Sequence, residues 1–466
     1  MKRNRHIPLR FVISLLLLTA AACNSKLDVK PGQHITPDEI RTAADVKAVL
    51  FGAYKSMQDF NAFGERYILI PDLLGSAGQV SFVGTFTEYR DIFNKAQVAQ
   101  SLIAQGIWQR SYVTINGANV VLSKLDLLDA AEKDAVEGEA RFVRALTYYE
   151  LVNLFGQPYS AGNIGVNEAV PLVLEPTTVY DPEKDNKPRA TVDAVYKQIV
   201  SDLTAAAATL PASYSDNNGR ATKYAAQALL SKVYMAQARY TEAATAATEV
   251  ISEGGFSLAA TFDKAFNNVS GSTEDIFAML QTDQSNGGSA NSGLTTMYAA
   301  YNATPMAGRG DVRVDTNLYK IYGEHDDRRA FIYEGTGIAG GIGEYSRKWK
   351  DFYRAIPVIR LADIYLIRAE ANARAGATIG GKTPLEDVNT VRVRAHAAAL
   401  ATVTAEQVVE ERFRELAFEG DWLWTRKRLK MNIGTRSYND PKMVLPVPQR
   451  ERDVNELLSQ NPGYDN

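Results

Sequence analysis

Hydrophobic side chains recur every three to four residues along much of the chain, which is the period of an amphipathic helix. The clearest stripe lies between residues 137 and 155 and consists of Phe142, Ala145, Leu146 and Tyr149. Similar patterns predict further helices at 36–57, 106–128, 191–209, 221–237, 240–253, 358–375, 384–397 and 404–430. The pattern therefore predicts a mainly α-helical framework.

One stretch of this framework has the composition of a packed helix pair. Between Ala228 and Ala247, small residues stand where two helices must approach closely, and Tyr234 and Tyr240 stand where the gap between helices needs filling. This looks like a tetratricopeptide helix pair. The period of about 34 residues typical of that repeat is not kept elsewhere, so we expect irregular helix pairs rather than a regular solenoid.

Four long stretches between the predicted helices have another character. They are rich in Gly, Asn, Ser, Thr and aromatic residues and lie at 60–95, 156–190, 254–350 and 431–466. They contain short strand-like runs such as Phe331-Ile332-Tyr333. Loops of more than about 15 residues are usually functional or disordered, and the aromatic content argues against disorder. We expect them to pack into an irregular capping subdomain, interleaved with the helices, that contains a few short strands.

The N-terminus has the layout of a secretory signal. Basic residues at positions 2 to 10 precede an uncharged, mostly apolar run at 11–22, which ends in Ala20-Ala21-Ala22-Cys23. Twelve helical residues rise only about 18 Å, which is short of the ~30 Å hydrocarbon core of a membrane. We therefore interpret residues 1–22 as a cleaved signal peptide rather than a membrane-spanning helix.

Cys23 is the only cysteine of the chain, so no internal disulfide can form. Small residues before a cysteine resemble a bacterial lipobox, in which the thiol receives a diacylglycerol, although Ala20 stands where a branched residue is usual. The alternative is a plain signal peptide with an incidental Cys23. Acylation explains the cysteine better, and residues 23–35, with Pro31 and Gly32, are then a polar tether.

The charge balance argues against a nucleic-acid partner. The chain has 51 basic and 54 acidic side chains and a net charge of −3. Removal of the basic signal segment leaves a still more acidic protein. No stretch is dense in Lys and Arg, so phosphate binding of the kind nucleic acids require is not indicated.

Four blocks, in order along the chain, resemble the SusD/RagB family of outer-membrane nutrient-binding lipoproteins. They are 139–156 (EARFVRALTYYELVNLFG), 358–371 (VIRLADIYLIRAEA), 411–420 (ERFRELAFEG), and Leu445-Pro446-Val447-Pro448 followed by Asn461-Pro462-Gly463-Tyr464. After Gly420 the sequence departs from the family pattern, with Asp421, Trp422 and Thr425 in place of the usual residues. The blocks and the lipobox span nearly the whole mature chain.

This resemblance implies a tetratricopeptide-like helical framework capped by a loop-rich subdomain, which together form one domain from residue 36 to 466. It also implies a protein that is anchored in the outer membrane through Cys23, faces the cell exterior and forms a lid over a TonB-dependent transporter of the SusC type. Such a protein captures oligosaccharides, or peptides in some branches, and passes them to the transporter. It breaks no bond and needs no catalytic residue, cofactor or metal.

Aromatic residues in the loops are the candidate ligand contacts. A sugar ring stacks its C–H face on an aromatic plane, and its hydroxyl groups need amides or carboxylates. In the family, an early loop and a mid-chain insertion commonly line the ligand surface. The candidates at the corresponding places are Phe82, Phe86, Tyr89, Tyr298, Tyr301 and Asn302. A packing role remains the alternative for each ring, because most large side chains are buried.

Other motifs are better explained as structural. Residues 335–340 spell GxGxxG, but no helix follows that could hold a pyrophosphate, so we expect a hairpin tip. His34, His325 and His396 lie far apart, which disfavours a metal site. We expect the charged cluster 324–329 around His325 to be a solvated turn.

Two carboxylate pairs are candidates for the acid and base of a glycoside hydrolase. Glu137 and Glu139 point to opposite faces of their helix. Asp363 and Glu370 share a face, but their helix is apolar nearly all round and is predicted to be buried. Buried ion pairs are the preferred interpretation of these groups. An exported hydrolase and a helical-repeat adaptor of the cell envelope remain the alternative functions.

Overall fold

Helices build most of the part of the chain that the computed structural model describes, residues 39–215, 219–289, 291–301 and 308–464. The chain divides into two units, residues 1–41 and residues 42–466, and the elements named below belong to the second. Strands within it are few and short. The predicted mainly α-helical fold class is confirmed. None of the described helices has both the length and the apolar character needed to cross a membrane.

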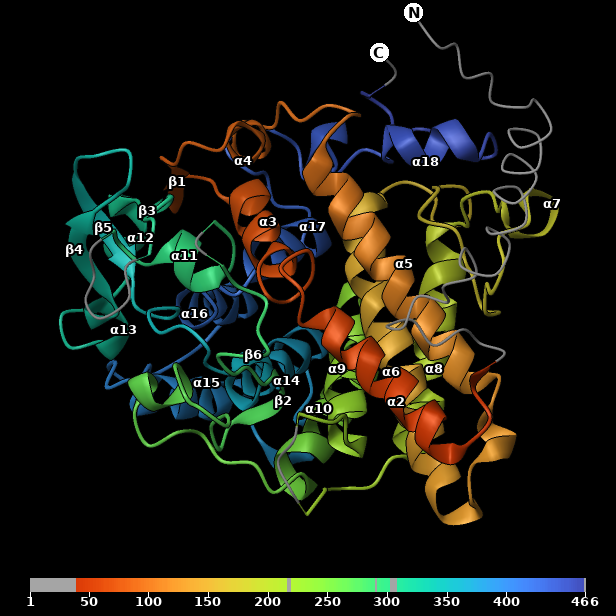
Figure 1. The fold of residues 1–466 in the computed structure, drawn as a ribbon. Helices are drawn as coiled ribbons and strands as arrows, with labels where there is room; N and C mark the ends of the chain where they lie inside the picture. Colours follow the sequence, from red (N-terminus) through yellow and green to blue (C-terminus); the bar gives the residue numbers. More distant parts are fainter. Residues whose placement is uncertain (1–38, 216–218, 290, 302–307, 465–466) are drawn as a thin grey trace, which may run out of the picture. The chain divides into compact units, whose positions relative to one another are not determined.

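The long helices form a framework in which each packs on its neighbours in sequence. They are α2 (Ala43–Met57), α5 (Leu102–Leu122), α6 (Ala130–Phe155), α8 (Val192–Thr209), α9 (Lys223–Ala236), α10 (Tyr240–Glu253), α14 (Leu361–Ala375), α15 (Pro384–Arg394), α16 (Ala405–Glu415) and α17 (Asp421–Arg428). Each helix contacts the next: α2 contacts α5, α5 contacts α6, and the succession continues through α8, α9 and α10 to α14. Helix α14 also packs on α15 and α16. In Figure 1, α2, α5 and α6 lie side by side at the right of the view. This succession is the predicted set of irregular helix pairs.

Threonine side chains begin several of these helices. Thr42, Thr191, Thr222, Thr383 and Thr404 each accept a hydrogen bond from the backbone N–H three residues on. Such a bond satisfies one of the N–H groups that the first helical turn leaves unpaired. The local sequence therefore sets where the framework helices start.

The loop-rich part contains two small antiparallel sheets. The larger has the strand order β1 (Val80–Phe82), β3 (Val312–Val314), β5 (Ile342–Ser346), β4 (Ile332–Thr336), and the smaller pairs β2 (Asp275–Met279) with β6 (Ile356–Arg360). The larger sheet lies at the left of Figure 1, on the opposite side of the view from α5 and α6. Residues 337–341 form the tip of the β4–β5 hairpin, as predicted for the GxGxxG run.

Short helices connect the sheets and loops. They are α3 (Arg66–Gly75), α4 (Thr87–Phe93), α7 (Pro182–Asp185), α11 (Leu294–Tyr298), α12 (Thr316–Tyr319), α13 (Asp327–Ala330) and α18 (Gln449–Val454), with 3-10 turns η2 (Leu125–Leu127), η3 (Phe262–Ala265), η4 (Ile379–Gly381) and η5 (Pro441–Met443). Two of them, α3 and α4, fall in the stretch 60–95 that was expected to be irregular. The pattern does not reveal α3 because nearly every residue in it is buried, and Pro71 lies inside it.

Other helix predictions need correction. The helix expected at 36–57 begins only at Ala43, after the N-cap residue Thr42. The helix expected at 404–430 is two helices, because Phe418 (φ 67°) and Gly420 (φ 77°) adopt left-handed backbone conformations that end α16 and precede α17. The helix expected at 358–375 begins only at Leu361, since residues 356–360 form strand β6.

A buried charge network joins the helical framework to the loop-rich part. At its centre, the carboxylate of Glu415 in α16 lies 2.5 Å from Arg394 and 3.2 Å from both Arg360 and Arg328. Its other members are Glu274, Asp326, Lys348, Glu411 and Glu419. These residues come from β2, β6, α13, α15 and α16 and the segments beside them, so the network holds the two parts of the fold together.

Candidate functional site

Strand pairing brings the two predicted ligand loops together. Because β1 pairs with β3, the loop after β1 lies against the segment that precedes β3, and the Val83 N–H donates to the Asp311 carbonyl at 2.8 Å. The approach is close, since a Cβ on Gly84 would lie 2.2 Å from the Asp311 carboxylate. The early loop and the mid-chain insertion therefore form one surface.

Arg309 links the residues of this surface. Its guanidinium group lies 4.4 Å from the ring centroid of Phe86 and donates to Thr85 Oγ1 at 2.9 Å and to Asn291 Oδ1 at 3.4 Å. Its Nε lies 2.8 Å from the buried Asp311 carboxylate. A cation against an aromatic face is stabilising, and the added hydrogen bonds fix its orientation. The surface is thus held in place before any ligand arrives.

Tyr301 lies beside Arg309 and offers an exposed ring. Its N–H donates to the Thr336 carbonyl at 2.7 Å, and it bridges to Gly308, the residue before Arg309. Tyr301 is 41% exposed, and Phe86 is half-buried. Thr85, Phe86, Asn291, Tyr301 and Arg309 together are called the Phe86–Tyr301 surface below.

Three of the aromatic rings that were predicted to contact a ligand are buried in the structure. They are Phe82, Tyr89 and Tyr298, none more than 6% exposed. Phe82 and Tyr89 stack with centroids 5.8 Å apart, and Tyr89 meets Phe86 edge-on at 6.0 Å. With so little free surface, these rings have a packing role here, whereas Phe86 and Tyr301 can face a ligand. Cys23 and Asn302 lie outside the described residues.

Two buried carboxylates on α3 hold the mid-chain insertion. Glu65 accepts hydrogen bonds from the Tyr89 hydroxyl and, at 2.6 Å, from the Gly293 N–H at the start of α11. Asp72 accepts from the Tyr298 hydroxyl at 2.6 Å at the end of α11. Burial raises the pKa of Asp72 to about 8 and also raises that of Glu65. Both ends of α11 are therefore fixed to α3.

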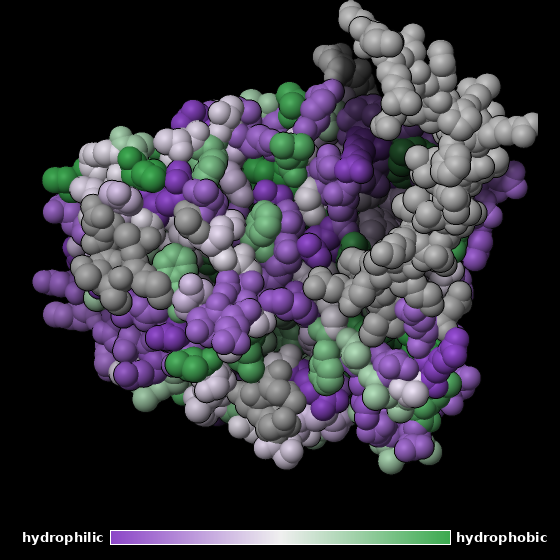
Figure 2. Space-filling view, in the orientation of Figure 1, coloured by the Kyte–Doolittle hydropathy of each residue, from purple (hydrophilic) through white to green (hydrophobic). Residues whose placement is uncertain are grey.

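The surroundings of this surface suit a hydrated ligand. On the face drawn in Figure 2, hydrophobic residues occur as small separate groups among hydrophilic ones. Aromatic rings with polar neighbours are typical of such partly wet sites. The sequence indicated Phe86 and Tyr301 through their aromatic character, but it carried no signal for Arg309, whose role depends on the pairing of β1 with β3.

Histidines and acidic residues do not gather into a metal site within the described ranges, where no group of three or more His, Cys, Asp or Glu residues could hold a metal. His325 is exposed, as expected for a solvated turn. In the same cluster, however, Asp326 and Arg328 are buried members of the charge network, so that part of the prediction is wrong.

The carboxylates that were candidates for a hydrolase acid and base all form ion pairs. Glu139 binds Arg220, and Glu137 binds Arg141 at 2.7 Å. Asp363 lies 2.7 Å from Lys232 and 2.6 Å from Arg412, and Glu370 lies 2.7 Å from Arg374. Asp363 and Glu370 are also almost fully buried. This is the structural role that the sequence favoured.

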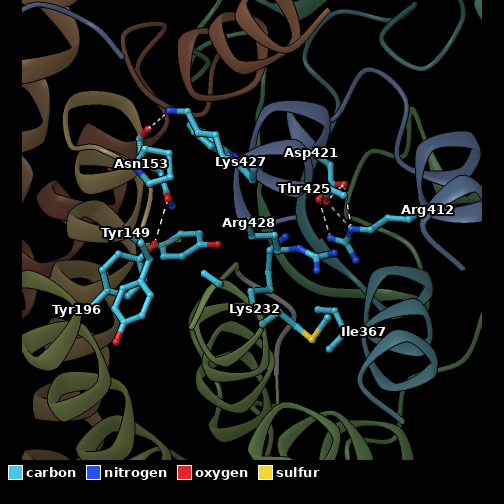
Figure 3. Close-up of a pocket in the computed structure, with 15 residues that line it drawn as sticks. Tyr149, Asn153, Tyr196, Lys232, Ile367, Arg412, Asp421, Thr425, Lys427 and Arg428 are labelled. Carbon is cyan, nitrogen blue, oxygen red and sulfur yellow. Dashed lines mark hydrogen bonds and ion pairs between the residues drawn. The ribbon is translucent and has the colours of Figure 1, made fainter. Parts of the chain in front are cut away.

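A polar pocket of about 540 Å³, part of it open to solvent, lies between helices of the framework (Figure 3). Its walls include Tyr149, Tyr196, Arg412 and Asp421, and the last two form an ion pair at 2.6 Å. Lys427 also lines the pocket; its ammonium group donates to the Asn153 carbonyl at 3.0 Å, and burial lowers its pKa to about 7. A ligand would compete here with existing ion pairs, so we favour the Phe86–Tyr301 surface as the functional site.

Family models match two regions of the chain. A model described as "Starch-binding associating with outer membrane" matches residues 27–235, and a model of the SusD family matches residues 344–432. SusD-like protein P2 of Formosa agariphila is 28% identical over 520 aligned positions, which cover 97% of this chain and 98% of that protein. Starch-binding protein SusD of Bacteroides thetaiotaomicron is 31% identical over 180 positions, 30% of this chain and 31% of its own.

Solved structures show the same fold. A SusD superfamily protein from Bacteroides thetaiotaomicron superposes with a TM-score of 0.79 at 24% identity, covering 90% of this chain and 100% of its own. A laminarin-binding SusD-like protein superposes with a TM-score of 0.75 at 24% identity, covering 91% and 100%. The helical framework and its loop-rich cap therefore form an architecture that this chain shares with those proteins.

Proposed function

The chain belongs to the SusD/RagB family, and from this membership we propose that it is a cell-surface lipoprotein that binds oligosaccharides and delivers them to a SusC-like TonB-dependent outer-membrane transporter. The family is one of carbohydrate-binding proteins. A relative is named as starch-binding and a structural neighbour as laminarin-binding. Those names support a glycan ligand here, with a peptide as the alternative.

One observation carries the choice of binding surface. Arg309 contacts both Phe86 of the early loop and Asn291 of the mid-chain insertion. The exposed ring of Tyr301 lies beside it. The aromatic planes can stack on the C–H face of a sugar, and the amide and guanidinium groups can bind its hydroxyls. The surface thus combines the two kinds of contact that a pyranose ring requires.

Membrane attachment is proposed to occur through Cys23, the only thiol of the chain. Acyl chains on that residue would hold the protein at the outer membrane, facing the exterior. Affinity for glycan can then be modest, because the tether and the transporter raise the effective concentration of ligand at the channel. We infer no catalytic step, since the carboxylates weighed for hydrolysis are engaged in ion pairs.

Affinity electrophoresis of residues 23–466 in gels containing neutral polysaccharides, starch and laminarin among them, tests the binding function. We expect retardation by at least one glycan, and Tyr301→Ala and Phe86→Ala should weaken it. Tyr180→Ala, which removes a 54% exposed ring in another part of the chain, is the matched control and should behave as wild type.

Three results would overturn the proposal. One is the absence of retardation by any glycan together with failure to capture an outer-membrane barrel protein in a pull-down. Another is release of new reducing ends from the polysaccharides, which would favour the hydrolase. The third is capture of a partner without any binding of glycan or peptide, which would favour the adaptor.

A further inference from the structure

A second pocket, of about 420 Å³, lies between the start of α11 and the segment 349–356. Its walls contain none of the residues of the Phe86–Tyr301 surface. The two places are nevertheless neighbours, because Asn291 belongs to that surface and Gly293 lines the pocket. Part of this volume is open to solvent, so the pocket is an open recess rather than an enclosed cavity.

Two consecutive aromatic residues form one wall of the pocket. In extended chain, consecutive side chains point to opposite sides. Tyr353 has a φ of 59°, which breaks this alternation, and the rings of Phe352 and Tyr353 come to lie with centroids 5.9 Å apart at an interplanar angle of 51°. Both residues are half-buried, so part of each ring is free.

The backbone conformation of Tyr353 is imposed by its surroundings. A bulky side chain in the left-handed region is uncommon, and it persists only where neighbouring structure fixes it. Asn267 Oδ1 accepts hydrogen bonds from the N–H groups of Lys350 and Asp351, each at 3.1 Å, and Gln281 Nε2 donates to the Arg354 carbonyl at 3.0 Å. These bonds hold the chain on both sides of Tyr353 without involving its ring.

Glycines form another part of the lining. Gly64, Gly288 and Gly293 all line the pocket. A Cβ on Gly293 would lie 2.8 Å from the Gly288 Cα, and a Cβ on Gly64 would lie 2.5 Å from the Gln58 carbonyl oxygen. Close backbone packing therefore leaves part of the wall without side chains.

Polar groups complete the lining. The amides of Asn267, Gln281 and Asn286 and the partly exposed carboxylate of Asp351 border the pocket. The side-chain oxygens of Gln281 and Asn286 each accept one hydrogen bond and keep a second lone pair for a hydroxyl, whereas Asn267 Oδ1 already accepts two. Arg354 also lines the pocket and balances the charge of Asp351. Aromatic planes and amide oxygens in a lining without net charge match a neutral sugar better than an anion or an apolar molecule.

We propose that this pocket is a second carbohydrate subsite, in which Phe352 and Tyr353 stack on a pyranose ring of an oligosaccharide that also occupies the Phe86–Tyr301 surface. The inference rests on the proposed glycan-binding function. Its consequence is that long oligosaccharides, which reach both places, bind more tightly than short ones.

Isothermal titration of residues 23–466 with a chain-length series of a glycan that the protein retains tests the subsite. The key variants are Tyr353→Gly and Phe352→Ala. Glycine accepts a positive φ without strain, which offsets part of the stability lost with the ring, and a thermal unfolding midpoint checks that Tyr353→Gly is folded. Tyr180→Ala again serves as the control for loss of an exposed ring.

In the wild-type chain, affinity should rise with oligosaccharide length. Each variant should weaken binding of the longest member about tenfold, as expected for loss of an aromatic stack, and leave the shortest unchanged. An equal loss at every length would also place sugar at these rings.

Wild-type affinity of both variants at every length would overturn the subsite. If Tyr301→Ala abolishes binding in that case, the proposed function survives and the subsite alone fails. A wild-type chain that binds no glycan, or that binds only peptide, would overturn both proposals.

Discussion

Glu415 is the residue whose loss should most weaken the connection between the framework and the loop-rich part. Its carboxylate lies within 3.2 Å of three arginines, Arg328, Arg360 and Arg394, and is fully buried. These guanidinium groups lower its pKa from 4.5 to about 2, despite the opposing effect of burial. Each pKa unit corresponds to about 1.4 kcal/mol, so the ionised carboxylate contributes about 3 kcal/mol to folding at neutral pH.

Glu415→Gln keeps the size of the side chain and removes its charge. We expect the free energy of unfolding at pH 7 to fall by about 3 kcal/mol, the range measured when one partner of a buried ion pair is removed. Glu410→Gln on the same helix is the matched control, because Glu410 is 62% exposed and lies 3.5 Å from Arg414. An ion pair as exposed as Glu410–Arg414 contributes about 1 kcal/mol or less to the free energy of unfolding. Urea denaturation with comparison of both midpoint and slope measures the two effects.

The pH dependence gives an independent check. Because the pKa of Glu415 is lower in the folded chain, its contribution is complete above the unfolded value of about 4.5 and is lost as the pH falls toward 2. The gap between wild type and Glu415→Gln should therefore shrink by about 1 kcal/mol at pH 4 and about 2 kcal/mol at pH 3. A gap at pH 7 under about 1 kcal/mol, an equal effect of Glu410→Gln, or a gap independent of pH would refute the reasoning.

Three further outcomes are expected. Tyr298→Phe removes the hydroxyl that donates to Asp72 and should lower the free energy of unfolding by about 1–2 kcal/mol. Glycan affinity should stay at the wild-type level, and a loss of affinity in titrations would indicate that Tyr298 contacts the ligand. Lys427→Met should raise stability at pH 6 by about 1–3 kcal/mol, because the buried ammonium lacks a carboxylate partner among the described residues. The lowered pKa of Lys427, about 7, means that wild-type stability rises with pH above 7, so the advantage of Met should shrink by pH 9, and a constant or growing advantage would contradict this. Cys23→Ala should move the protein from the membrane to the soluble fraction and abolish metabolic labelling with palmitate, whereas retention of the label would exclude Cys23 as the attachment point.

The helical framework could be predicted because its signals are local. Amphipathic stripes and threonine caps both depend on residues only three or four positions apart. Helix α3 was missed for a physical reason. It is enclosed on all sides by the loop-rich part and by α17, so its residues 66–75 have no polar face to produce a period.

The partners in the buried ion pairs could not be predicted from neighbouring residues in the sequence. Arg412 and Arg414 are the arginines nearest to Glu415 in sequence. The structure instead pairs Arg412 with Asp421 and Asp363, and it supplies Glu415 with arginines 21 to 87 residues away. The sequence indicated that charged side chains on the apolar helices form buried ion pairs, but which oppositely charged residue each one pairs with depends on how distant segments pack.

The same limit applies to the candidate site. Of the rings predicted to face a ligand, the half-buried Phe86 and the exposed Tyr301 lie outside the helices, Phe86 just before α4 and Tyr301 after α11. Tyr89 and Tyr298 lie within those helices and are buried. Aromatic composition indicated two loops that the structure brings together, but which ring is free depends on short helices that the sequence did not indicate.

Helix α3 connects the framework to both proposed sugar contacts. Asp72, which holds Tyr298, also accepts a hydrogen bond from the Gly420 N–H between α16 and α17 at 3.1 Å. Glu65 holds the other end of α11 through Gly293. Since α11 lies between the Phe86–Tyr301 surface and the second pocket, its position sets both of them. Exposed rings on either side can therefore change to suit another glycan without disturbing the buried carboxylates that fix the scaffold, which separates specificity from stability in this fold.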